Sequence, residues 1–165
     1  MVQPYPTAAK TPGTERPSVP SSVRNAVTAM YAGAAAEIIH VILFLVTEGS
    51  TRTAYARKHP RLSAHKVTVG AHALVFSGAI GAVIGAVLFI WIALMCLRGR
   101  NWARITGTVF FGLGVLGALV EFGVAVSAVD KIWDIVIVLI GLVAVILLWQ
   151  GKSGEYFNRS SRPEA

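Results

Sequence analysis

Four long apolar stretches dominate this chain and limit the folds that are open to it. They cover roughly residues 26–46, 71–97, 105–129 and 132–149, and each is close to or above the ~18 to 20 residues that cross ~30 Å of hydrocarbon. Of the 165 residues, 55% are hydrophobic and 14% are charged, which lies outside the composition of a soluble domain. The sequence therefore predicts an all-α membrane protein, a four-helix antiparallel transmembrane bundle over residues 23–150.

Short polar segments flank this bundle. Residues 1–22 hold five prolines among Ser, Thr and Gly, a composition that predicts a disordered tail. Residues 151–165 predict a short polar C-terminal tail. Ser21 or Ser22 is expected to cap the first helix at its amino end.

Two turns are predicted to join the spans into hairpins. In the segment 98–104 a glycine interrupts the helical pattern, and the side chains around it suit a position among lipid headgroups. These predicted anchors are Arg98, Arg100, Trp102 and Arg104. A second turn is predicted at Asp130–Lys131, and Ser63 is expected to cap a long helix that runs to Leu97.

The basic residues predict an orientation. Nine of the 15 Lys and Arg residues lie on the side of the two termini and the 98–104 turn. Because positive charge favours the cytoplasmic side, we expect a plasma-membrane protein with both termini in the cytoplasm. The inverted orientation stays open, since the loop 48–67 on the other side is also basic.

Three ionisable residues lie deep inside the spans, where charge is expensive. Glu37 and His40 are three residues apart and therefore neighbours on one helix face, and Glu121 falls among small residues of the third span. The three form a candidate intramembrane polar site, with His40 and Glu121 at similar depths. Two interpretations remain: the cluster only specifies helix pairing, or it responds to protons or ions. A metal site is not expected, because the spacing of Glu37 and His40 suits a di-iron bundle but the further ligands are missing.

Small residues at helical spacing predict where the helices approach one another. The predicted contact positions are Gly33 in the first span, Ser77, Gly81 and Gly85 in the second, and Gly107, Gly114 and Ala118 in the third.

Short segments of the chain resemble a loose group of small four-helix membrane proteins of high-GC Gram-positive bacteria and their phages. The segments span 17–27, 30–34, 59–63, 99–104, 147–149 and 156–157. The resemblance implies a plasma-membrane location with the Trp102 turn inside. It implies no catalytic residue.

No motif in the chain predicts catalysis: there is no P-loop, nucleophile elbow or H-E-x-x-H sequence. We expect a protein that is not an enzyme and needs no cofactor. Its expected partners are the lipid bilayer and either a second copy or another membrane protein, but not nucleic acid. A non-enzymatic interaction or regulatory role is the first interpretation. A small oligomeric proton-linked transporter or channel, or a phage-type exclusion or holin-like protein, is the alternative.

Overall fold

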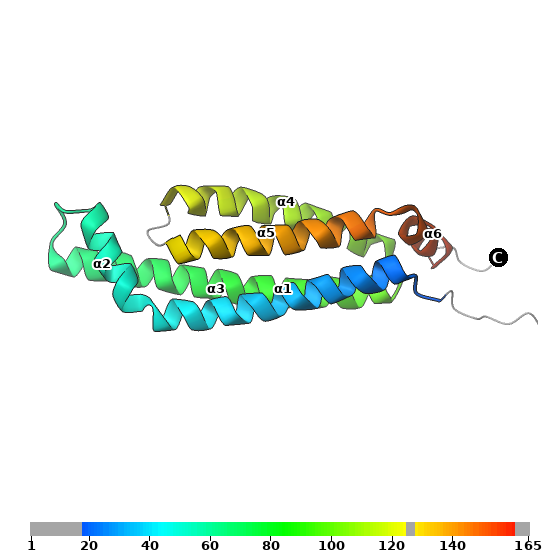
Figure 1. Cartoon of the computed structure of the whole chain (residues 1–165), viewed down its shortest axis with the longest axis horizontal. Helices are drawn as coiled ribbons and strands as arrows, with labels where there is room; N and C mark the ends of the chain where they lie inside the picture. The colour runs from blue at the N-terminus through cyan, green and yellow to red at the C-terminus, as the bar shows by residue number, and fades with distance from the viewer. Residues whose placement is uncertain (1–17, 125–127, 161–165) are drawn as a thin grey trace, which may run out of the picture.

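The computed structural model of the protein describes residues 18–124 and 128–160, and these are mostly helical. In these ranges the helices are α1 (Ser21–Val46), α2 (Glu48–Lys58), α3 (Ala64–Leu97), α4 (Asn101–Val124), α5 (Ala128–Leu148) and α6 (Gly151–Ser160) (Figure 1). The helices α1, α3, α4 and α5 are long and apolar enough to cross a membrane. The predicted all-α bundle of four spanning helices is confirmed.

The four long helices form a ring in which every neighbouring pair is antiparallel. Figure 1 shows α1 beside α3 and α4 beside α5. Helix α1 also packs along α5, so it contributes to the two most extensive interfaces of the bundle. The interface between α3 and α4 is the least extensive of the four.

Large apolar side chains cover the outside of this ring. Ile42 on α1, Val87 on α3, Leu119 on α4 and Leu139 on α5 are all more than half exposed. Such a surface is costly in water and ordinary against acyl chains. The chain is therefore a multi-pass membrane protein, with α2 and α6 at opposite ends of the bundle (Figure 1).

The tightest packing lies at the end of the bundle where α1 begins and α5 ends. Val23 and Ala26 of α1, Cys96 of α3 and Leu148 of α5 are fully buried there, and Phe157 of α6 packs into the same cluster. Helix α6 is held to this end by polar contacts as well. Tyr156 Oη donates to the carbonyl of Leu97 at 2.9 Å, and the Ser153 and Ser22 hydroxyls lie 2.7 Å apart.

At the opposite end, α2 packs against the first turns of α3, and both extend past the ends of α4 and α5 (Figure 1). The Tyr55 ring lies so close to Gly70 that a Cβ there would stand 2.6 Å from it. Ser63 accepts a hydrogen bond from the Lys66 amide at 3.4 Å and α3 runs to Leu97, so the predicted start and end of that helix are confirmed.

The predicted cap of the first helix is wrong. The residue before the first turn is Pro20, which makes no side-chain cap, while Ser22 lies inside the helix and bonds Ser153. Of the predicted tail 1–22, residues 1–17 lie outside the described ranges. Where a polar C-terminal tail was expected, residues 151–160 form α6, and 161–165 lie outside the described ranges.

One of the two predicted turns is confirmed and the other is wrong. The turn at Gly99 is confirmed, because this residue has φ 70, a left-handed conformation that suits glycine, and α4 starts two residues later. The turn at Asp130–Lys131 is wrong, since both residues lie within α5. The third span consequently ends before residue 129, which already belongs to α5.

The predicted headgroup anchors lie at the Gly99 turn. The Trp102 ring packs against Trp91 with 5.3 Å between centroids. Arg104 turns toward the bundle, with its guanidinium 4.4 Å from the Trp149 ring centre and 5.6 Å from that of Phe157. Arg98 and Arg100 are exposed. Arg104 thus links α4 to α5 and α6, a role that differs from the exposed positions of the other two arginines.

Candidate functional site

A cavity of about 390 Å³ lies between the four spanning helices. Its wall is mostly apolar and includes the rings of Phe44, Phe89, Phe110 and Phe111. Three ionisable side chains also line it: Glu37, His40 and Asp134. The described part of the wall contains no Lys or Arg.

Two of these three side chains were predicted as a pair, and the structure brings them together. Glu37 Oε2 lies 3.9 Å from His40 Nδ1, one turn apart on α1. The distance is too long for a hydrogen bond, and the two groups form an ion pair only when the imidazole is protonated. Their side chains are 12% and 9% exposed, so water does little to screen them.

Glycine makes room for the Glu37 carboxyl. A Cβ at Gly85 on α3 would stand 2.9 Å from Glu37 Oε1. The carboxyl therefore rests against the backbone of α3, on the face where this helix has no side chain. In this arrangement Gly85 positions the acid in addition to bringing two helices together.

Aromatic rings hold the His40 imidazole in place. It stacks on Phe44 with 4.3 Å between ring centroids and 25° between the planes, and it meets Trp133 of α5 at 5.5 Å. A Cβ at Gly78 would stand 2.5 Å from the Phe44 ring, so a second glycine of α3 makes room for this stack. Among the described residues, neither His40 Nε2 nor Trp133 Nε1 has a hydrogen-bond partner, although both atoms are buried.

Sequence reasoning missed Asp134 as a member of the site, because an acid near the start of a helix suits the helix dipole. The position of Asp134 in the sequence did indicate that it faces the cavity. It lies on one helical stripe with the small residues Gly141 and Ala144 and with Ile137, and all four line the cavity. Asp134 is six residues from the start of α5 and His40 six residues from the end of the antiparallel α1, so the two have equal depth.

Glu121, the third predicted member, belongs to the backbone of α4, but its side chain lies outside the described residues. Helices α1 and α4 occupy diagonal positions in the bundle and share no interface in the described part of the chain. The expected pairing of Glu121 with His40 stays a prediction.

The predicted small-residue positions divide into three groups. Gly33 lies beneath the Phe89 ring, and Gly107 lies beside Ile92, with 3.0 and 3.1 Å to a built Cβ. Gly81, Gly114 and Ala118 line the cavity with Gly85, but a Cβ at Gly81 or Gly114 would have no atom within 4 Å. Ser77 is exposed and donates to the carbonyl of Leu74.

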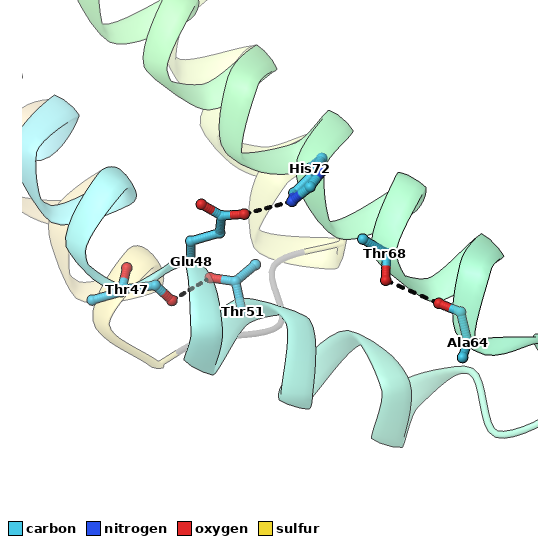
Figure 2. Close-up of polar contacts among 6 residues, drawn as sticks. All are labelled: Thr47, Glu48, Thr51, Ala64, Thr68 and His72. Carbon is cyan, nitrogen blue, oxygen red and sulfur yellow. Dashed lines mark hydrogen bonds and ion pairs between the residues drawn. The ribbon is translucent and has the colours of Figure 1, made fainter.

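His72 belongs to a different contact, outside the cavity wall. Figure 2 shows His72 of α3 reaching Glu48 at the start of α2, with 2.6 Å between Nε2 and Oε1. Both side chains are roughly half exposed. This ion pair ties α2 to α3 at the edge of the bundle and adds nothing to the cavity.

The described residues contain no group of three or more His, Cys, Asp or Glu side chains placed to hold a metal ion. Glu37, His40 and Asp134 therefore share a cavity without forming a coordination site. A comparison of the chain with protein-family models, with curated proteins and with solved structures found no match. The geometry of the cavity has to carry the functional argument.

Proposed function

We propose that this protein acts without catalysis, by holding a small hydrophobic ligand in the cavity between its four spanning helices. The observation that carries the proposal is the cavity itself. A volume of about 390 Å³ falls in the range of ~300 to 1,000 Å³ that holds drug-sized ligands. An apolar, aromatic wall with a few polar groups on one side is the usual composition of such a site.

The glycines of the cavity wall support this proposal. Gly81, Gly114 and Gly117 line the cavity although no neighbouring atom would meet a Cβ at any of them. Helix contact therefore does not require glycine at these positions. Larger side chains there would fill the space, so glycine preserves the volume of the cavity.

The binding test uses this geometry. Three radiolabelled probes share one diphenylpropyl body and differ in the head group: an ammonium, an alcohol and a carboxylate. We expect saturable binding of at least one probe to the purified protein in detergent. Gly114→Leu should abolish it by filling the cavity, whereas Gly112→Leu should retain it, because Gly112 lies on the same helix outside the cavity wall and also has open space around it.

Non-saturable uptake of all three probes, or equal binding to both glycine variants, would contradict the proposal. Elution volume and helical content of each variant show whether it has folded.

The proposal includes a location. The distribution of Lys and Arg supports the plasma membrane with both termini and α6 in the cytoplasm and α2 outside. The resemblance to small membrane proteins of high-GC Gram-positive bacteria supports the same arrangement. Its partners are the bilayer and, through the exposed apolar faces of the bundle, a second copy or another membrane protein.

A second candidate function is proton-linked transport. It is favoured by one observation, the position of the Glu37–His40 pair inside the cavity rather than on a lipid-facing surface. Liposomes that contain the protein should then show a flux that Glu37→Gln removes. No flux, or equal flux in both proteins, excludes this candidate and leaves the binding proposal untouched.

A further inference from the structure

The polar groups of the cavity offer hydrogen-bond acceptors, so a ligand that satisfies them has to supply hydrogen-bond donors. Glu37 and Asp134 are carboxyl groups, and carboxylates only accept hydrogen bonds. His40 lies beside Glu37, with Nδ1 as the atom that faces the carboxyl. A neutral imidazole has one donor and one acceptor nitrogen, so His40 accepts a hydrogen bond at Nε2 in the tautomer that carries its proton on Nδ1. Asp134 adds a second carboxyl to the same wall.

Neither Glu37 nor His40 is fully satisfied by the protein. Within the described part of the chain, the one ionic or hydrogen-bonding partner of Glu37 is His40, at 3.9 Å. His40 is 7% exposed and its Nε2 has no partner among the described residues. A buried polar atom without a partner is costly, and a buried carboxylate without a cation is more so. Among the described residues, Glu37 and His40 Nε2 are therefore open to a hydrogen-bond donor that carries positive charge.

The rest of the wall determines the body of the ligand. Phe44, Phe89, Phe110 and Phe111 line the cavity together with Ile and Val side chains. Aromatic rings attract cations through their faces and bury apolar groups through their area. No Lys or Arg lies on the described wall, so no basic side chain there competes with a cation for Glu37.

We propose that the cavity binds a hydrophobic organic cation with N–H donors, a protonated amine on an aromatic or branched apolar body. The ammonium group lies between Glu37 and His40 Nε2, and the apolar body lies against the phenyl rings. This inference rests on the proposed function and specifies its ligand. The helices need not separate, because the volume is present in the structure, but His40 Nε2 is buried and meets the ammonium group only when the imidazole ring turns.

The three diphenylpropyl probes test this assignment, with one addition. At neutral pH 3,3-diphenylpropylamine is a cation with donors, 3,3-diphenylpropanol is neutral and 3,3-diphenylpropanoate is an anion. The trimethylammonium derivative of the same body keeps the positive charge and has no N–H group. The four probes separate the contribution of charge from that of hydrogen bonding while the apolar body stays constant.

We expect the primary ammonium to bind about tenfold or more tightly than the alcohol, and the carboxylate most weakly, because charge-assisted hydrogen bonds are the strong ones. The trimethylammonium probe should bind with intermediate affinity. Glu37→Gln should remove the preference for cations, and His40→Phe should reduce the preference for the primary over the trimethyl cation, because Glu37 still accepts hydrogen bonds from the primary ammonium. Glu48→Gln is the matched control, since this acid pairs with His72 outside the cavity.

The possible failures are distinguishable. If the alcohol or the carboxylate binds as well as the ammonium and Gly114→Leu abolishes that binding, the cavity is a ligand site and the cation assignment is wrong. If no probe binds saturably, the proposed function itself fails. The order of the four affinities is measured on the wild-type protein, so the assignment is tested even if a variant at Glu37 does not fold.

Discussion

Glycine at position 78 is the clearest case in which one residue determines both packing and site geometry. The Phe44 ring occupies the space that a side chain at 78 would need, and the same ring stacks on His40. A methyl group at this position therefore displaces the aromatic support of the imidazole as well as the helix contact. Gly81, one turn further along α3, has no such neighbour.

We predict that Gly78→Ala destabilises the bundle by about 1 to 3 kcal/mol, the usual cost of overpacking. Gly81→Ala should have little effect, because no atom lies within 4 Å of its built Cβ. Thermal unfolding of both variants in the same detergent, followed by circular dichroism, gives the comparison. Equal melting temperatures for the two variants would show that the Phe44 ring moves aside at no cost.

The surface pair of Glu48 and His72 is expected to contribute little to stability. Glu48 and His72 are roughly half exposed, and exposed ion pairs contribute at most about 1 kcal/mol. Glu48→Gln should thus leave the melting temperature nearly unchanged. A large loss of stability would mean that the α2–α3 contact depends on this pair more than on Tyr55 and Gly70.

At the residue scale, the sequence was informative wherever a local rule applied. Glu37 and His40 were predicted as neighbours because their spacing alone places them on one helix face. Asp134 was missed because its contribution depends on the alignment of α1 with α5, which spacing within one helix cannot show. The cap at Ser21 or Ser22 failed for a similar reason, since Ser22 bonds Ser153 from the other end of the chain.

At the scale of elements, the spans were predictable and the short helices were not. Length and apolarity are properties of a segment by itself, and both the Ser63 cap and the Gly99 turn are local. Helices α2 and α6 are short and polar, and short isolated helices are marginal in water. They depend on contacts with distant residues, Tyr55 with Gly70 and Phe157 with the core of the bundle.

Helix α6 should accordingly stabilise the whole bundle. Phe157 is fully buried in the core cluster, and we predict that Phe157→Ala costs about 3 to 5 kcal/mol. Tyr156→Phe removes the hydrogen bond to the Leu97 carbonyl, and such a bond is worth about 1 kcal/mol. The exposed neighbour Asn158 supplies the control, and Asn158→Ala should unfold like the wild type in a thermal or denaturant titration.

If Phe157→Ala also unfolds like the wild type, the contact of α6 with the bundle contributes no stability in detergent. Such a result would leave the spanning helices as an independent unit.

For the whole molecule, an even number of spans places α6 and the start of α1 on one side of the membrane and α2 on the other (Figure 1). The orientation is testable with single cysteines in a Cys96→Ala background. Thr53 on α2 and Asn158 on α6 are both exposed, and Thr53→Cys and Asn158→Cys leave the count of Lys and Arg unchanged. An impermeant maleimide added to intact cells should label position 53 at once and position 158 only after the cells are permeabilised.

Labelling of position 158 in intact cells, with position 53 protected, would instead show the inverted orientation. The basic segment that includes α2 would then lie in the cytoplasm.

The limited contact between α3 and α4 bears on how a ligand reaches the cavity. If the proposed ligand enters through this interface, the least extensive of the bundle, it comes from the lipid and crosses no water. The amount of ligand available to the protein is then the amount dissolved in the lipid, which for an amphiphilic amine exceeds its aqueous concentration by the oil–water partition coefficient. A modest intrinsic affinity is enough to keep such a site occupied.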